Sequence, residues 1–388
     1  MVWSYIKESI VRGTVQLVRR PMYVLTIIIV PLLSAWILLD MMSPGSVRRV
    51  PVGVVDLDRS ALSNQLTRRL RSFQQVNIRK QYANFNEARN AVQRGDVYGF
   101  FFIPSDFSER TLSGRQPVVS YYVNYSYFAP ASMQYKGFKT ISLLANGGVV
   151  QTSMRTLGLT DQAIAAKLQP ILADSHAIGN PWLNYNYYLS ASFVPCLLAL
   201  MILLTTAFSI GIELKTGLCR QWLATAGDNI GLALLGKLLP QTVLFTVIGW
   251  AIQWMMYIAY GLPLNCPPAR MLIAMPLFVM ANQGLTVTFF CFCPNFRYGT
   301  TLCTLFGMLS FSFCAFSLPE EAMYPWVAAL GYIMPVKYYY LISVDQALNG
   351  IAPYYSRLYY AALIGFILLP LPLKWRLKAE CRNPFYIP

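Results

Sequence analysis

One motif in this chain has residues of the types and spacing that can bind phosphate. Gly231, Gly236 and Lys237 have the spacing of a phosphate-binding loop as far as the lysine. Such a loop needs a Ser or Thr directly after the lysine to bind magnesium, and a strand before its first glycine. Leu238 follows Lys237 and the neighbouring residues are apolar. We therefore interpret the match as accidental and expect nucleotide to bind a different chain.

Metal and acid–base chemistry have equally weak support. Cys291 and Cys293 are one residue apart, but the chain holds a single histidine, His176, so few zinc sites could be completed. The aspartates of a long polar segment suit turns and helix caps better than paired acid and base groups: they are Asp56, Asp58, Asp96 and Asp106. We predict no catalytic residue, no metal and no cofactor in this chain.

Apolar residues dominate the composition. They make up 56% of the 388 residues and charged residues only 12%, which is too apolar for an ordinary soluble domain. We predict a membrane α-helical protein with six transmembrane helices, at 21–42, 188–212, 238–258, 271–293, 298–318 and 359–373. Pro31 should kink the first of them. No nucleic-acid motif accompanies the net charge of +15, so we expect contact with the lipid bilayer and not with nucleic acid.

The segments outside these runs differ in character. Residues 1–20 place Trp3, Ile6, Ile10 and Leu17 opposite Glu8, Arg12, Gln16 and Arg19 on a helical wheel, which predicts an amphipathic helix in the headgroup plane. Residues 43–187 mix strand and helix patterns and predict an inserted α/β domain. Its strands are expected at 50–56, 97–103 and 118–124, and its helices after Ser60, at 86–94, at 130–157 and at 160–172.

Two shorter segments interrupt the five-helix region 188–375. Residues 213–229 contain Leu214, Leu218 and Trp222 at four-residue spacing, which predicts a short amphipathic helix in a loop. Residues 319–350 hold two apolar stretches that are too short to cross, split by Pro335. We expect these to be re-entrant helices shielded by other helices, because irregular backbone cannot face lipid.

Basic residues set the expected orientation. They gather in residues 1–20, in 213–229 and in the tail 376–388, which predicts that these segments and both termini are cytoplasmic. The 43–187 domain then lies outside the membrane on the other side, as an extracytoplasmic domain, and the re-entrant segment 319–350 faces the same side. We expect a multi-pass protein of the cell (inner) membrane.

Three stretches together resemble the permease subunits of type-2 ABC exporters. The loop carries Glu213, Gly217, an Ala-Thr step and the entry Gly236-Lys237-Leu238-Leu239 into the next span. The polar domain carries VGVVDLDRSALSNQL and the later run NEARNAVQRGDVYGFFFIPSDFSERTLSGRQP, and the re-entrant segment carries SLPEEAMYPWVAALGYIMPVKYYYLISVDQALNG. The chain departs from the family pattern at Ala226, where Pro is usual, and at Cys219 and Arg220, where acidic residues are common.

The resemblance implies an ATP-driven exporter whose permease has no nucleotide site of its own. It implies an ABC ATPase subunit as partner, a second permease copy or paralogue, and efflux of an unidentified substrate, with a periplasmic adaptor protein as a further possible partner. The residues it assigns to ATPase coupling are Glu213, Gly217, Leu218, Gln221 and Trp222. Those it assigns to an outer re-entrant gate are Pro319, Met323, Trp326, Pro335 and Tyr338.

Two other functions stay open from the residues alone. An ion-coupled secondary carrier would place ionisable groups near the middle of its helices, whereas the charges here lie near the ends of the runs. A membrane-anchored ligand sensor would need one or two spans instead of six.

Overall fold

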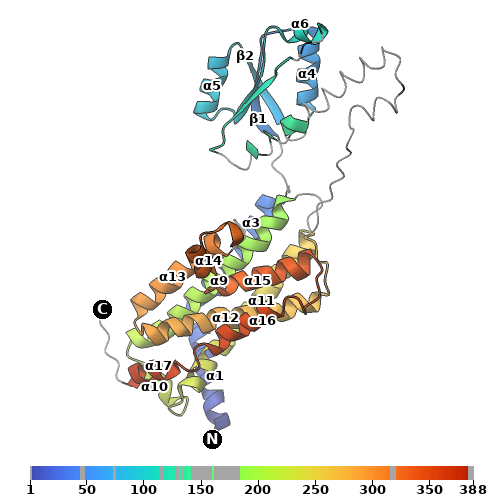
Figure 1. Ribbon diagram of the computed structural model, residues 1–388. Helices are drawn as coiled ribbons and strands as arrows, with labels where there is room; N and C mark the ends of the chain where they lie inside the picture. Colours follow the sequence, from blue (N-terminus) through green and yellow to red (C-terminus); the bar gives the residue numbers. More distant parts are fainter. Residues whose placement is uncertain are drawn as a thin grey trace. The chain divides into compact units, whose positions relative to one another are not determined.

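The structure, a computed structural model, describes most of the chain. The described residues are 2–43, 49–72, 76–113, 115, 117–126, 131–132, 134–135, 137–140, 160, 184–314 and 320–382. The chain divides into two compact units, one made of residues 1–45 and 177–388 and the other of residues 46–176. We call them the helical unit and the sheet unit (Figure 1). Pro319, His176 and most of the helices expected at 130–157 and 160–172 lie outside the described residues.

The helical unit begins with two successive helical stretches. Helix α1 spans Val2–Arg19, and a second stretch comprises α2 (Pro21–Val24), a π-helical turn (Leu25–Ile29) and α3 (Val30–Met42). Pro31 lacks an N–H, so the usual bond to the carbonyl of Ile27 is missing. The wider π-helical turn ends directly before this gap, which is a common way to absorb it.

Four helical stretches among the described residues are long and apolar enough to cross a membrane. They are Pro21–Met41, α9 (Tyr185–Lys215), α11 (Ile230–Trp254, continued by a π-helical turn at Met255–Ala259) and α12 (Pro268–Phe292). The start predicted for the third run, at residue 238, is wrong. Helix α11 begins at Ile230 because the Asn229 side chain caps it, accepting a hydrogen bond from the Gly231 N–H at 3.0 Å.

The remaining helices are shorter or more polar. They are α10 (Cys219–Ala224), α13 (Phe296–Phe313), α14 (Pro325–Gly331), α15 (Pro335–Ile342, continued by a π-helical turn at Ser343–Leu348), α16 (Arg357–Leu368) and α17 (Lys374–Arg382). Helices α14 and α15 meet at 83°, as a broken span or a re-entrant loop, and counting this bent pair as one span gives up to five candidates. The last predicted run, 359–373, is not one helix, since α16 ends at Leu368, just before Pro370 and Pro372.

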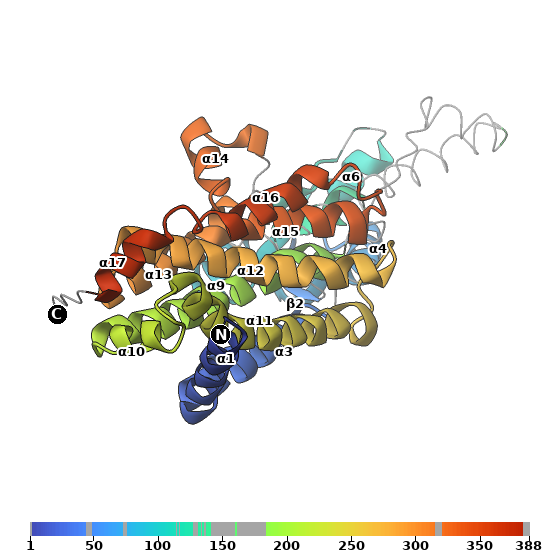
Figure 2. The same cartoon turned by 90° about the horizontal axis from the view of Figure 1, so that it is seen from below.

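Helix α9 lies at the centre of the helical unit. It packs against α3, α12 and α13, while α16 lies on α12 and α1 runs along α11 (Figure 2). The α1–α11 contact is a backbone contact, because a Cβ added at Gly13 would lie 2.5 Å from the carbonyl oxygen of Gly236. Small residues at such crossings allow membrane helices to approach closely.

The sheet unit is a four-stranded α/β layer. Its strands are β1 (Val50–Asp56), β2 (Val76–Tyr82), β3 (Gly99–Ile103) and β4 (Ser120–Val123), in the order β2-β1-β3-β4, and only the β3–β4 pair is antiparallel. Its helices are α4 (Ala61–Arg71), α5 (Phe85–Arg94) and α6 (Phe107–Leu112). Helices α4 and α5 cover opposite faces of the sheet (Figure 1).

Side chains along β1 alternate between the two faces of the sheet, which explains why a helix packs on each face. Val52 and Val54 pack with Leu70 of α4 on one face, and Val55 packs with Ala88 and Ala91 of α5 on the other. Both helix ends use local signals in the sequence. Ser60 caps α4 by accepting from the Ser63 N–H at 3.1 Å, and Gly95 ends α5 with a φ of 80°.

Strand β2 was not expected from the sequence. It forms one edge of the sheet, and its only buried residues are the first and the last, Val76 and Tyr82. Arg79, Lys80 and Gln81 between them are exposed. Without regular apolar alternation, only pairing with β1 identifies this segment as a strand.

Candidate functional site

The candidate site is the link between α9 and α11, which we call the coupling segment, residues 213–229. Helix α9 ends at Lys215, and Gly217 turns the chain with a φ of 70°, a conformation that glycine adopts without strain. Six residues of α10 follow, and a tight turn through Gly227 and Asp228, also at positive φ, leads into α11. A short helix is therefore present as α10, but of the three residues that predicted it only Trp222 lies within it, since Leu214 belongs to α9 and Leu218 directly precedes α10.

Trp222 anchors α10 to the helical unit. Trp222 is only 1% exposed, and its indole N–H donates to the carbonyl oxygen of Ala233 in α11 at 3.2 Å. The ring packs in a cluster with Leu223 and Ala226, while the Lys237 ammonium lies 5.0 Å from the ring centroid. These contacts hold α10 against α11.

A buried ionic network joins three helices beside this anchor. Glu213 of α9 is 1% exposed, and its Oε1 accepts from the Lys237 ammonium of α11 at 2.6 Å. Its Oε2 accepts from Arg12 of α1 at 3.0 Å, and its Oε1 also accepts from the Gln16 amide at 2.8 Å. Lys237 further donates to Gln16 Oε1 at 3.0 Å. We call Arg12, Gln16, Glu213 and Lys237 the anchor network.

The five predicted coupling residues differ in how far they are buried. Glu213 and Trp222 are buried, so they hold the segment in place and present no surface. Leu218 is half-buried at the start of α10. Gly217 and Gln221 are exposed, beside Arg220 and Ala224. A contact surface on this segment therefore consists of Gly217, Gln221 and their exposed neighbours.

Among the predicted gate residues, Trp326, Pro335 and Tyr338 lie on the bent pair, Met323 comes just before α14, and Pro319 is outside the described residues. Trp326 of α14 is 66% exposed and Met323 is half-buried, while Pro335 at the start of α15 is buried. Tyr338 donates through its hydroxyl to the carbonyl oxygen of Tyr332 at 3.0 Å and so ties α15 to the end of α14. Three of the predicted gate residues thus belong to the bent pair, and Met323 lies just before it.

An unpredicted ion pair supports the bent pair. The Lys337 side chain is 2% exposed, donates to Glu320 Oε2 at 2.9 Å and lies 3.8 Å from the centroid of the Tyr332 ring. The Tyr332 hydroxyl also binds Glu320. This cluster fixes the short turn at 320–322 to both helices.

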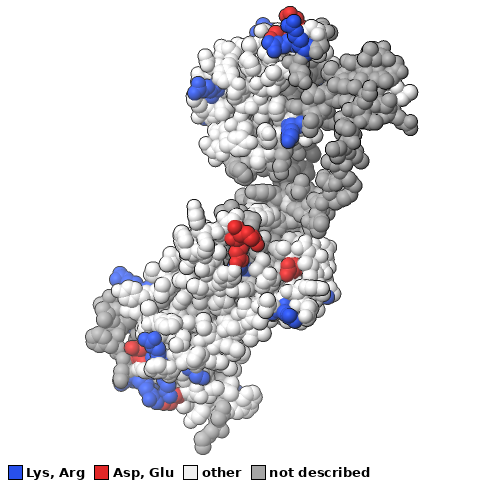
Figure 3. All heavy atoms as spheres, in the orientation of Figure 1, with Lys and Arg blue, Asp and Glu red and all other residues white. Residues whose placement is uncertain are grey.

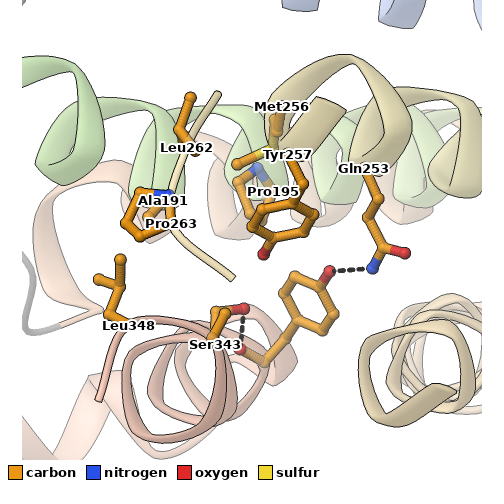
Figure 4. Close-up of a pocket in the computed structure, with 11 residues that line it drawn as sticks. Ala191, Pro195, Gln253, Met256, Tyr257, Leu262, Pro263, Ser343 and Leu348 are labelled. Atoms are coloured by element: carbon orange, nitrogen blue, oxygen red, sulfur yellow. Dashed lines mark hydrogen bonds between the residues drawn. The ribbon is translucent and has the colours of Figure 1, made fainter. Parts of the chain in front are cut away.

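A small cavity lies between α9, the end of α11 and α15 (Figure 4). Its volume is about 20 Å³, and its lining is mostly apolar, with Pro195, Met256 and Tyr257 among its members. Gln253 enters from α11 and donates to the Tyr339 hydroxyl at 2.9 Å and to the carbonyl oxygen of Met271 at 3.1 Å. The space holds about one water, and drug-sized ligands need roughly 300 Å³ or more.

Reasoning from the sequence missed the partners inside the helices. Gln16, Lys237, Gln253 and Lys337 all form the contacts above. Gln16 lies on the polar face predicted for residues 1–20, and for the other three only their positions within or beside apolar runs could have identified them. A polar side chain in such a run needs an internal partner, which is the usable signal. Gly231, Gly236 and Lys237 lie inside α11, so their loop-like spacing forms no loop.

Comparison with known proteins gives one match. The sequence model of a family described as "ABC-2 family transporter protein" matches residues 21–374, nearly the whole chain. A search of curated proteins returned no match.

Proposed function

Because this chain belongs to the ABC-2 transporter family, a family of multi-pass membrane permeases, we propose that it forms the path of an ATP-driven exporter powered by a separate ATPase subunit. The observation that carries the proposal is the construction of the coupling segment. Trp222 and Glu213 hold it rigidly from inside, while Gly217 and Gln221 are left on its surface. Rigid attachment and a free surface are what force transmission from a partner requires.

The proposed transmission uses the anchor network. ATP binding would bring two ATPase subunits together beneath a pair of permeases and push on α10. Since Glu213 joins α9, α11 and α1 within 3.0 Å, a push on α10 moves these three helices together. Coupling in this sense requires that nucleotide favour one helix arrangement over another.

Helix α13 supports pairing with a second permease copy. It is not among the stretches that qualify as spans by length and apolarity. Its exposed face mixes hydroxyl, charged and apolar side chains, which suits a protein partner or a path better than lipid: they are Arg297, Tyr298, Thr301, Thr304, Leu305, Met308 and Ser312. We place the path for substrate at this face, and we propose α13 and the α14–α16 region as the fifth and sixth crossings.

The proposed topology follows the distribution of basic residues. Both termini and the coupling segment lie in the cytoplasm, and the sheet unit, whose sequence is inserted between α3 and α9, lies outside the inner membrane. In that position it would gate entry of substrate or receive a periplasmic adaptor.

The test is purification of the chain in mild detergent with the ATPase subunit that accompanies it. Gln221→Trp adds bulk to the exposed face of α10, and we expect it to abolish ATPase stimulation by the permease. Asn349→Trp is the control, because Asn349 is equally exposed but lies after α15. If both variants stimulate as the wild type does, α10 is not the contact. A chain that purifies alone and moves cargo on an ion gradient would favour a secondary carrier.

A further inference from the structure

Helix α17 is built into the coupling segment. The sequence predicts only a tail at 376–388, whereas the structure forms a helix whose Leu377 and Cys381 are fully buried. Both pack in the cluster that contains Cys219 and Trp222 of α10. The neighbouring Cys219 thiol, together with burial, raises the pKa of Cys381 far above its ordinary value. The thiol is therefore an unreactive part of the packing.

Polar contacts also join the coupling segment to α17. The Arg220 side chain donates through Nε to the carbonyl oxygen of Arg382 at 2.9 Å and so satisfies a carbonyl at the end of α17. Lys378 and Arg382, one helical turn apart, both reach the Asp228 carboxylate, Lys378 at 3.2 Å. Hydrogen bonds from Arg382 and Lys378 hold the pKa of Asp228 below its ordinary value.

The backbone conformation at Asp228 allows its carboxylate to pair with α17. Its φ of 57° is unfavourable for most side chains, although Asp tolerates it better than most. The conformation places the carboxylate at the last turn before α11, where both cations of α17 reach it. Two ion pairs, a capped carbonyl and a shared apolar cluster make α10 and α17 one body.

The free surface of this body is basic. Exposed cationic side chains come from both elements, namely Lys215 and Arg220 beside or in α10 and Arg376 and Arg382 in α17, with Lys378 half-buried. Asp228 is already paired, which leaves Glu380 as the one unpaired acid among the described residues of α10 and α17. Figure 3 shows Lys and Arg gathered over α10 and α17, while the middle of the helical unit is almost free of charge.

We propose that α17 docks together with α10 on the ATPase subunit, and that its basic side chains meet an acidic surface of that subunit. The inference rests on the proposed function and adds a second docking element to it. Basic residues near a membrane also bind anionic headgroups, but the ties to α10 distinguish this helix. A helix held only by lipid has no need of a partner for its terminal carbonyl or of a clamp on Asp228.

The attachment of α17 is tested with Asp228→Asn. Asn keeps the shape and tolerates positive φ, so the fold is retained while both ion pairs lose their anion. Alkylation of Cys381 by N-ethylmaleimide, followed by peptide mass spectrometry, should accelerate on the order of fivefold. Glu380→Gln removes an exposed acid from the same helix and should leave the rate unchanged. Equal rates in Asp228→Asn and wild type would overturn the attachment.

The docking role is tested with Arg376→Glu in the complex with the ATPase subunit that co-purifies with wild type. Arg376 is exposed and contacts only the Phe292 ring, 5.7 Å away, among the contacts described for it, so the substitution spares the fold. We expect about tenfold weaker binding of the subunit, and binding that falls with salt. Arg357→Glu, an exposed reversal at the start of α16, should have no effect.

The outcomes separate the two proposals. Wild type that retains no ATP-hydrolysing subunit overturns the proposed function. Wild type that retains it, with Arg376→Glu equal to wild type, overturns the docking role of α17 alone. If Arg376→Glu instead weakens binding only to vesicles containing phosphatidylglycerol and leaves the complex intact, α17 is a lipid contact and the inference fails.

Discussion

Replacement of Glu213 by Gln probes the anchor network most directly. The change keeps the volume and one acceptor oxygen but removes the charge from a side chain that is 1% exposed. Lys237, which is 3% exposed, then has no counter-charge, and neither has Arg12 at 19%. Removal of one partner from a buried ion pair costs about 3–5 kcal/mol, because the other charge stays buried and uncompensated. We expect Glu213→Gln to lower the free energy of unfolding by this amount.

The reverse substitution, Lys237→Met, should cost less. Glu213 then keeps Arg12 at 3.0 Å and Gln16 at 2.8 Å, so its charge stays compensated. The loss should be about 2 kcal/mol, because Lys237 gives up two hydrogen bonds, to Glu213 and to Gln16, with a usual net value of about 1 kcal/mol each. The double variant should be more stable than Glu213→Gln alone, because Arg12 is partly exposed and can be hydrated.

Thermal unfolding in detergent, followed by tryptophan fluorescence, measures this asymmetry. A protein of this size shifts its Tm by roughly 2 °C per kcal/mol, so Glu213→Gln should lower Tm by roughly 6–10 °C and Lys237→Met by about 4 °C. Glu8→Gln is the control, since Glu8 is an exposed acid on α1. A Glu213→Gln loss no larger than that of Lys237→Met would refute the account of the network.

Three further outcomes follow from the structure. Gly236→Ala places a Cβ against Ser9 and should loosen α1 at a cost of about 1–3 kcal/mol, seen as faster trypsin cleavage at Lys7, whereas Gly365→Ala meets no atom within 4 Å and should not. Glu320→Gln leaves the buried Lys337 without a counter-charge and should lower Tm more than Lys337→Met does. The Glu320 that remains in Lys337→Met is 33% exposed and can be hydrated, and equal shifts in Tm would contradict this. In sealed spheroplasts, a membrane-impermeant maleimide should label Arg89→Cys in the sheet unit but not Gln221→Cys, and the opposite pattern would reverse the proposed topology.

Local signals in the sequence predicted many elements well. Strand β1 has the expected bounds because Val50–Asp56 is apolar on both faces, and Gly95 ends α5 as expected because only a residue that tolerates positive φ continues the chain there. The membrane-helical class follows from composition alone. The resemblance to type-2 ABC permeases is confirmed by the match to the ABC-2 transporter family.

What the sequence left open depends on contacts between distant segments. The sequence predicted that the third helix begins at residue 238, but Lys237 lies inside α11, where it pairs with Glu213 of α9. Strand β2 forms because β1 offers a free edge. The sequence predicted only a tail where α17 forms, because this segment has few apolar residues. Two of them, Leu377 and Cys381, pack against α10. The number of helices that cross the membrane likewise depends on how α14 and α15 bend.

The charges on β2 have a consequence for the partners of the sheet unit. An uncovered outer strand offers unpaired N–H and C=O groups that can template another chain, and natural sheets block this with charged side chains. Arg79 and Lys80 occupy that margin here. Extension of the sheet by an incoming segment next to β2, and the self-association that often goes with it, is thereby disfavoured. A protein that binds the sheet unit on this side is expected to contact the outer faces of α4 or α5 instead of the β2 edge.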